Sequence, residues 1–164
     1  MRNDGLILVV DDEWWVSLFI RVGLEEAGFA AMEVPDAEAA LAVVDTTPVR
    51  VLVTDLELGP GPDGLALSEA VQRRCPGLPT VYASGDPYRF GRRGLAAWER
   101  FVPKPFPLET LVRVVTEMAA GDRAGAGLWT AQQRNWLSPS HRAAPMRCPA
   151  HGPPSWPAAA ARPP

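Results

Sequence analysis

Short apolar runs alternate along the chain with longer segments that have helical periodicity, up to about residue 120. The apolar runs have the length of β-strands, and the strands they predict cover residues 6–10, 30–34, 49–55, 80–84 and 100–102. Runs that are apolar throughout are typical of parallel strands that are buried on both faces. The pattern therefore predicts a parallel sheet with helices on both sides, a doubly wound α/β fold.

The segments between these strands predict helices that cover residues 13–27, 36–45, 65–74, 87–98 and 107–120. Asp36 is expected to cap the second of them. In the first, Trp15, Phe19 and Val22 recur at helical spacing, so this stripe is predicted to face the core. Trp15 is accordingly expected to be buried. Trp14 is expected at the rim of the crevice formed by the strand ends.

The C-terminal part, residues 121–164, differs in composition from the rest. It is rich in proline, alanine and arginine and has no aliphatic periodicity. Such a composition is typical of disorder. We therefore expect one globular domain over residues 5–120 and a largely disordered tail over 121–164.

Charge and hydropathy argue against a nucleic-acid-binding domain and against a secreted or membrane-spanning protein. The net charge is −3, and the acids are concentrated before the tail, which argues against nucleic-acid binding by the domain itself. The apolar run near the N-terminus is only five residues long, too short for a signal peptide or a membrane span. We therefore expect a cytoplasmic protein that does not cross a membrane.

Polar residues follow the predicted strands at their carboxyl ends. Asp11 and Asp12 follow the first strand, Asp55 ends the third, Ser84 ends the fourth, and Lys104 comes after the fifth. Because the carboxyl ends of parallel strands meet at one edge of the sheet, these side chains are expected to face one crevice.

Three carboxylates in one crevice repel one another, and a hard divalent cation would offset that repulsion. Mg²⁺ prefers oxygen ligands and leaves room for a phosphate oxygen, while a lysine ammonium can bind a second phosphate oxygen. A carboxylate beside both cations can attack phosphorus and become an aspartyl-phosphate. The set of residues therefore favours phosphoryl transfer onto an aspartate.

The sequence resembles a response-regulator receiver domain of two-component signalling, a flavodoxin-like α/β fold with strand order 2-1-3-4-5. The resemblance covers residues 5–120, and it is carried by VVDDE (9–13), VLVTDLEL with PDG (51–64), YASG (82–85) and FVPKPF (101–106). It implies that Asp55 is the phosphoacceptor. It also implies that Mg²⁺ is bound by the carboxylates of Asp12 and Asp55 and the backbone carbonyl of Glu57 directly, and by Asp11 mainly through water.

The resemblance implies roles for three further residues. Ser84 and Lys104 are expected to contact the phosphoryl group. Phe101 matches the aromatic residue that changes rotamer on activation in this family. The Lys104–Pro105 peptide bond is expected to be cis.

We therefore expect a phosphorylation-controlled signalling switch, not an enzyme. Its partners would be a histidine kinase or phosphotransfer protein and a downstream protein target. The tail has no pattern for a helix-turn-helix, so we expect a stand-alone receiver without a DNA-binding domain. One alternative is an adaptor that keeps the fold but is not phosphorylated. The other is a Mg²⁺-dependent phosphatase of the haloacid-dehalogenase type, although its Asp-x-Asp motif would belong on the first strand.

Overall fold

A five-stranded parallel sheet forms the centre of the molecule. The computed structural model describes residues 5–90 and 94–121, and the rest of the predicted tail (122–164) lies outside them. The strands are β1 (Leu6–Val10), β2 (Ala31–Val34), β3 (Val49–Thr54), β4 (Thr80–Ser84) and β5 (Glu99–Pro103). They lie in the order β2-β1-β3-β4-β5, and every neighbouring pair is parallel, so the predicted sheet and its order are confirmed.

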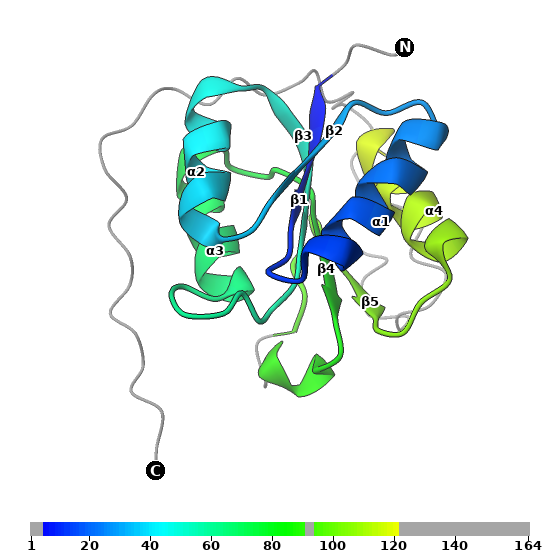
Figure 1. Ribbon diagram of the computed structural model, residues 1–164. Helices are drawn as coiled ribbons and strands as arrows, with labels where there is room; N and C mark the ends of the chain where they lie inside the picture. Colours follow the sequence, from blue (N-terminus) through cyan, green and yellow to red (C-terminus); the bar gives the residue numbers. More distant parts are fainter. Residues whose placement is uncertain (1–4, 91–93, 122–164) are drawn as a thin grey trace.

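Helices cover both faces of this sheet, as the apolar strands predicted. They are α1 (Trp14–Glu26), α2 (Ala37–Thr46), α3 (Gly64–Arg74) and α4 (Leu108–Ala119). Figure 1 shows α1 and α4 on one face and α2 and α3 on the other. No helix among the described residues is both long and apolar enough to cross a membrane.

The side chains of β1 show why its sequence is apolar at every position. Ile7 and Val9 belong to the core cluster that α1 and α4 cover, whereas Leu8 and Val10 belong to the cluster under α2 and α3. Successive side chains of a strand point to opposite faces, so a strand buried on both sides needs an apolar residue at each position.

Aspartates cap two of the helices. The Asp36 carboxylate accepts a hydrogen bond from the Ala39 backbone N–H at 2.8 Å and caps α2, as predicted. The Asp63 carboxylate accepts one from the Ala66 N–H at 2.9 Å and caps α3. Each cap satisfies a backbone donor that the first turn of a helix leaves unpaired.

The prediction for the buried face of α1 is wrong. Trp15 is 57% exposed, and Phe19 and Val22 of the same stripe are exposed as well. The buried residues are those of the neighbouring stripe: Val16, Ser17, Ile20, Gly23 and Leu24. Two apolar stripes overlap on this helix, and packing selects the one with Gly23, where a Cβ atom would overlap the Leu108 side chain of α4.

The helix predicted over residues 87–98 is also wrong. The described residues between β4 and β5 contain only the short 3-10 helix η1 (Pro87–Phe90). Phe90 packs edge-on against Tyr82 and Phe101, with ring centroids 5.0 and 5.5 Å away. Further along, the Glu99 carboxylate accepts hydrogen bonds from the Tyr82 hydroxyl and the Ala96 N–H, both at 2.8 Å. These contacts hold the described residues on either side of 91–93, and apart from η1 none of those residues is helical.

Candidate functional site

The predicted site residues except Phe101, which is the middle residue of β5, lie at or just beyond the carboxyl ends of the strands, and these ends point to the lower end of the molecule in Figure 1. Asp11 directly follows β1, Asp55 directly follows β3, Ser84 is the last residue of β4, and Lys104 directly follows β5. Four strands that adjoin in the sheet therefore deliver a carboxylate, a second carboxylate, a hydroxyl and an ammonium group to one edge.

One ammonium group joins two of the carboxylates. Lys104 Nζ donates to Asp11 Oδ2 at 2.8 Å and to Asp55 Oδ2 at 2.7 Å. The side chains of Asp11 and Asp55 are 2% and 10% exposed, and that of Lys104 is 22% exposed. The structure thus brings together three residues, with Lys104 lying 49 positions from Asp55 and 93 from Asp11 in the sequence.

Backbone groups hold the other oxygen of each carboxylate. Asp11 Oδ1 accepts a hydrogen bond from the Glu13 N–H at 2.9 Å, and Asp55 Oδ1 accepts one from the Glu57 N–H at 3.1 Å. Both contacts reach two residues ahead, as aspartate side chains commonly do in turns. Each carboxylate is therefore fixed from two sides before any ligand arrives.

The electrostatics of the site follow from its burial. Burial raises the pKa of the Asp11 carboxyl, and the hydrogen bonds from Lys104 and Glu13 only partly oppose it. Burial lowers the pKa of the Lys104 ammonium, but the hydrogen bonds and charges of Asp11 and Asp55 outweigh it, so this pKa lies above its usual value. Lys104 therefore carries its charge at neutral pH, and its positive charge stabilises the ionised form of Asp11, which burial disfavours.

The donor set suits Mg²⁺. Asp12 is exposed beside the loop after β3, since a Cβ atom on Gly59 would lie 3.2 Å from Asp12 Oδ2. Within 5–90 and 94–121, no group of three acidic, histidine or cysteine side chains is arranged to hold a metal ion. Asp11 and Asp55 each form an ion pair with Lys104 instead. Mg²⁺ usually takes one or two carboxylates and keeps several waters, so it needs no such cluster in advance.

Ser84 and Phe101 lie deeper than the charged residues. Ser84 is buried, and its Oγ accepts a long hydrogen bond of 3.4 Å from the Asp86 N–H. The Lys104 N–H donates to the Ser84 backbone carbonyl at 2.9 Å, which places these two residues side by side at the ends of the adjoining strands β4 and β5. Phe101 is buried with Leu56 and Tyr82 in a small apolar cluster. No hydrogen bond between described groups joins the Ser84 hydroxyl to Asp55.

Two residues that matter for the geometry were not predicted to do so. Gly64, the first residue of α3, packs against the backbone of Asp55 so closely that a Cβ atom would overlap the Asp55 carbonyl oxygen. Arg89, in η1, contacts both the loop after β3 and the segment after β4. The glycine of the PDG stretch was a visible signal for the first, whereas no local pattern marks the second.

Comparisons with known proteins agree with this fold. A family model for the response regulator receiver domain matches residues 7–116. The chain is 36% identical over 118 residues to the nitrogen assimilation regulatory protein NtrX of Azorhizobium caulinodans, a match that covers 69% of this chain and 25% of that protein. The chain therefore spans about a quarter of the length of that relative.

Solved structures of receivers are matched over nearly their whole length. A response regulator receiver protein from Sinorhizobium medicae WSM419 is similar with a TM-score of 0.68 at 25% identity, covering 75% of this chain and 99% of that one. The receiver domain of NtrX from Brucella abortus is similar with a TM-score of 0.61 at 32% identity, covering 69% of this chain and 97% of that one.

The Lys104–Pro105 peptide bond is cis, as the family resemblance implied.

Proposed function

Because the chain belongs to the response regulator receiver family, we propose that it is a signalling switch that accepts a phosphoryl group on Asp55. The donor would be a histidine kinase or a phosphotransfer protein, since a receiver domain of two-component signalling implies such a partner. The observation that carries the proposal is the Lys104 ammonium held between the Asp11 and Asp55 carboxylates at the carboxyl end of the sheet.

The chemistry would use the residues as follows. An oxygen of Asp55 attacks phosphorus while the bond from phosphorus to the donor's leaving atom breaks, and the leaving group keeps the electron pair. Lys104 shifts from the two carboxylates to an oxygen of the transferred group. The Ser84 hydroxyl turns from the Asp86 N–H to donate to another of these oxygens. Phe101 would follow into the space that Ser84 leaves.

Receiver domains typically bind Mg²⁺ for phosphorylation. Here it would be held by the carboxylates of Asp11, Asp12 and Asp55 and by the Glu57 carbonyl, and it would neutralise negative charge around the transferred group. Asp12 is the exposed carboxylate of the set and can turn without breaking a described ion pair.

Two alternatives have less support. A non-phosphorylated adaptor would not need Lys104 between two nearly buried carboxylates, an arrangement that costs desolvation energy. A haloacid-dehalogenase-type phosphatase would carry Asp-x-Asp on its first strand, and β1 is followed by adjacent aspartates instead. Receiver domains are typically signalling switches rather than true enzymes, and they are generally cytoplasmic; we propose both properties for this chain.

The metal requirement gives the first test. Beryllofluoride, which mimics a phosphoryl group on aspartate, is expected to shift the amide resonances of Glu57, Ser84 and Lys104 when Mg²⁺ is present. Removing the metal with EDTA should return the spectrum to that of the free protein, because three carboxylates cannot hold an anion unaided. Equal shifts with and without Mg²⁺ would exclude the proposed metal site.

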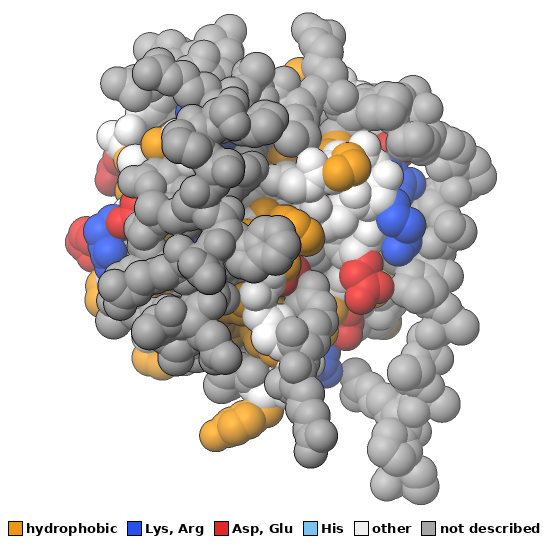
Figure 2. Space-filling model, turned by 180° about the vertical axis from the view of Figure 1, so that it is seen from behind, with side chains coloured by type: hydrophobic (Ala, Val, Ile, Leu, Met, Phe, Trp, Pro, Cys, Tyr) orange, Lys and Arg blue, Asp and Glu red, His pale blue; other side chains and the backbone are white. Residues whose placement is uncertain are grey.

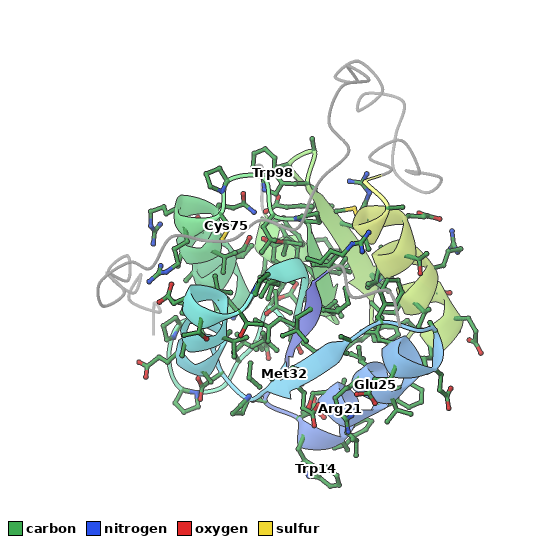
Figure 3. All side chains as sticks on the ribbon, turned by 90° about the horizontal axis from the view of Figure 1, so that it is seen from above. Trp14, Arg21, Glu25, Met32, Cys75 and Trp98 are labelled. Carbon is green, nitrogen blue, oxygen red and sulfur yellow. The ribbon has the colours of Figure 1, made fainter. Side chains whose placement is uncertain are left out.

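The donor is expected to dock beside the crevice, on the outer face of α1. Trp14 is 73% exposed and projects from the first turn of this helix, which begins directly after the site (Figure 3). Trp15, Phe19 and Val22 continue the exposed apolar surface along the helix. Exposed aromatic residues grouped in this way are typical of protein interfaces. We therefore propose that the phosphoryl donor docks on this face. A donor bound there would lie next to the crevice that holds Asp55, because α1 begins directly after the acids that follow β1.

Replacing Trp15 should separate docking from chemistry. Trp15→Ala is expected to slow transfer from a kinase that phosphorylates the wild type by about thirtyfold, since a central interface aromatic contributes on the order of 2 kcal/mol. Labelling by acetyl phosphate should be unchanged, because this small donor needs no docking face. Glu38→Ala, on the exposed side of α2, is the matched control and should leave both rates unaltered. If Trp15→Ala slowed transfer from the kinase and labelling by acetyl phosphate equally, Trp15 would act on the chemistry at Asp55 and not on docking.

The downstream target is proposed to be a protein that contacts the surface around η1. The buried Phe101 ring touches Phe90 of η1, so a movement of Phe101 reaches this element directly. Tyr88 beside it is 89% exposed and available for contact. Figure 2 shows the molecule from behind, with apolar side chains projecting at its lower edge.

A further inference from the structure

Arg89 lies between the two loops that carry the proposed phosphoryl chemistry. Its Nη1 donates to the Leu56 carbonyl oxygen at 3.5 Å and to Asp63 Oδ2 at 3.3 Å, both in the loop that follows Asp55. In the same loop, Glu57 Oε1 lies 4.0 Å from Arg89 Nη2. Its Nε lies 3.9 Å from Asp86 Oδ2, in the segment that follows Ser84. One guanidinium therefore spans both loops.

Each end of this bridge reaches the site through one further residue. On one side, Leu56 directly follows Asp55, and the Glu57 N–H donates to Asp55 Oδ1. On the other side, the Asp86 N–H donates to Ser84 Oγ. Arg89 is thus one contact away from the phosphoacceptor loop and one contact away from the switch hydroxyl.

Arg89 divides its contacts among three carboxylates, and none of these contacts is short. They range from 3.3 to 4.0 Å, longer than the roughly 2.7–2.9 Å of strong charge-assisted hydrogen bonds. Among the described residues, Glu57, Asp63 and Asp86 have ion pairs with Arg89 alone. Without Arg89 these carboxylates would repel one another across the gap between the loops. A small movement of either loop therefore redistributes the contacts of Arg89.

The same residue adjoins the aromatic cluster. Phe90, the next residue in η1, packs edge-on against Tyr82 and Phe101. A displacement of Arg89 along the chain is therefore passed to Phe90, and from there to the buried Phe101 ring. The path is contiguous from Ser84 through Asp86 and Arg89 to this ring.

We propose that Arg89 is a positioning residue that couples phosphorylation of Asp55 to η1 and Phe101; this inference rests on the proposed function. When the Ser84 hydroxyl turns toward a phosphoryl group, Asp86 loses its contact with that hydroxyl. Arg89 then moves with Asp86 while it remains attached to the Asp55 loop. A guanidinium suits this role because its donors are spread over three nitrogens in a rigid plane, so that Nε faces Asp86 while the two terminal nitrogens face the Asp55 loop.

The test compares variants in the response of the full chain to beryllofluoride with Mg²⁺. In Arg89→Ala, the resonances of Ser84 and Lys104 should still shift, whereas those of Phe90 and Phe101 should lose most of their shift. Beryllofluoride should also bind roughly two- to thirtyfold more weakly, the range by which single residues modulate coupling between sites. Arg89→Lys should fall between the wild type and Arg89→Ala. Arg113→Ala, on the exposed side of α4, is the matched control and should respond like the wild type.

A double-mutant cycle separates coupling from a merely structural effect. Asp86→Asn should also weaken the shift at Phe90. The double variant should lose no more of this shift than the more severely affected single variant does. Because Asp86 is partly exposed, this variant keeps the inference testable even if Arg89→Ala does not fold. Full shifts at Phe90 and Phe101 in Arg89→Ala, or additive effects in the double variant, would overturn the inference. A wild type that does not respond to beryllofluoride would instead overturn the proposed function.

Discussion

Asp55→Asn is expected to abolish covalent phosphorylation. The amide has nearly the shape of the carboxylate but lacks the anionic oxygen that attacks phosphorus. Lys104 would keep its ion pair with the buried Asp11, so the fold and the crevice should persist. The measurement is the phosphorylated fraction after incubation with acetyl phosphate and Mg²⁺, resolved on a gel that retards phosphoproteins. Label should fall by at least about a hundredfold, as expected when a nucleophile is removed.

The control for this variant is Asp36→Asn. It makes the same chemical change at the N-cap of α2, a position where asparagine caps as well as aspartate. Asp36→Asn should be phosphorylated like the wild type. If Asp55→Asn retained wild-type labelling, another residue would be the acceptor.

Gly64→Ala is expected to destabilise the protein by about 2–4 kcal/mol, the range of severe packing clashes. The added Cβ atom would overlap the Asp55 carbonyl oxygen and lie 3.0 Å from the Leu56 Cα atom. Neither neighbour is a flexible side-chain end, because both are backbone. The Gly64 N–H also donates to the Leu56 carbonyl at 3.0 Å, so relief by moving α3 would break this bond. Urea denaturation would report the loss of stability as a lower midpoint.

Gly85→Ala is the matched control for this prediction. Gly85 has no atom within 4 Å of a Cβ position, so alanine fits there. Its free energy of unfolding should differ from the wild type by less than about 0.5 kcal/mol, as for ordinary surface changes. In Gly64→Ala, phosphorylation of Asp55 should also slow, because the clash moves the backbone of Asp55. Wild-type stability for Gly64→Ala would mean that α3 can shift without cost.

The sheet and the grouping of polar residues at its strand ends were predictable from the sequence because both depend on short-range patterns. A strand buried on both faces must be apolar at every position, and β1 shows this directly. Parallel strands bring their carboxyl ends to one edge, so the order of strands and acids along the chain is enough to group Asp11, Asp55 and Lys104. The sequence could not predict that Lys104 would contact both carboxylates, since that depends on side-chain distances.

The predictions failed where two local patterns competed or where tertiary contacts decided. On α1 the stripe of Trp15 is as apolar as that of Ile20, and only the close approach of α4 at Gly23 selects between them. Between β4 and β5, residues with helical spacing are instead held by Phe90 in the aromatic cluster and by the buried Glu99. The contacts of Arg89 could not be predicted from the sequence, because most of them are made with a loop that is distant in sequence.

The identity of the phosphorylated residue is the most direct test of the proposed switch. The full chain would be labelled with acetyl phosphate and Mg²⁺, and borohydride would reduce the acyl phosphate to an alcohol. Peptide mapping by mass spectrometry would then locate the reduced residue. We predict reduction at Asp55 and at no other acid. Reduction at Asp11, Asp12 or Asp63, or no reduction in a folded protein that binds Mg²⁺, would contradict the assignment of Asp55 as the phosphoacceptor.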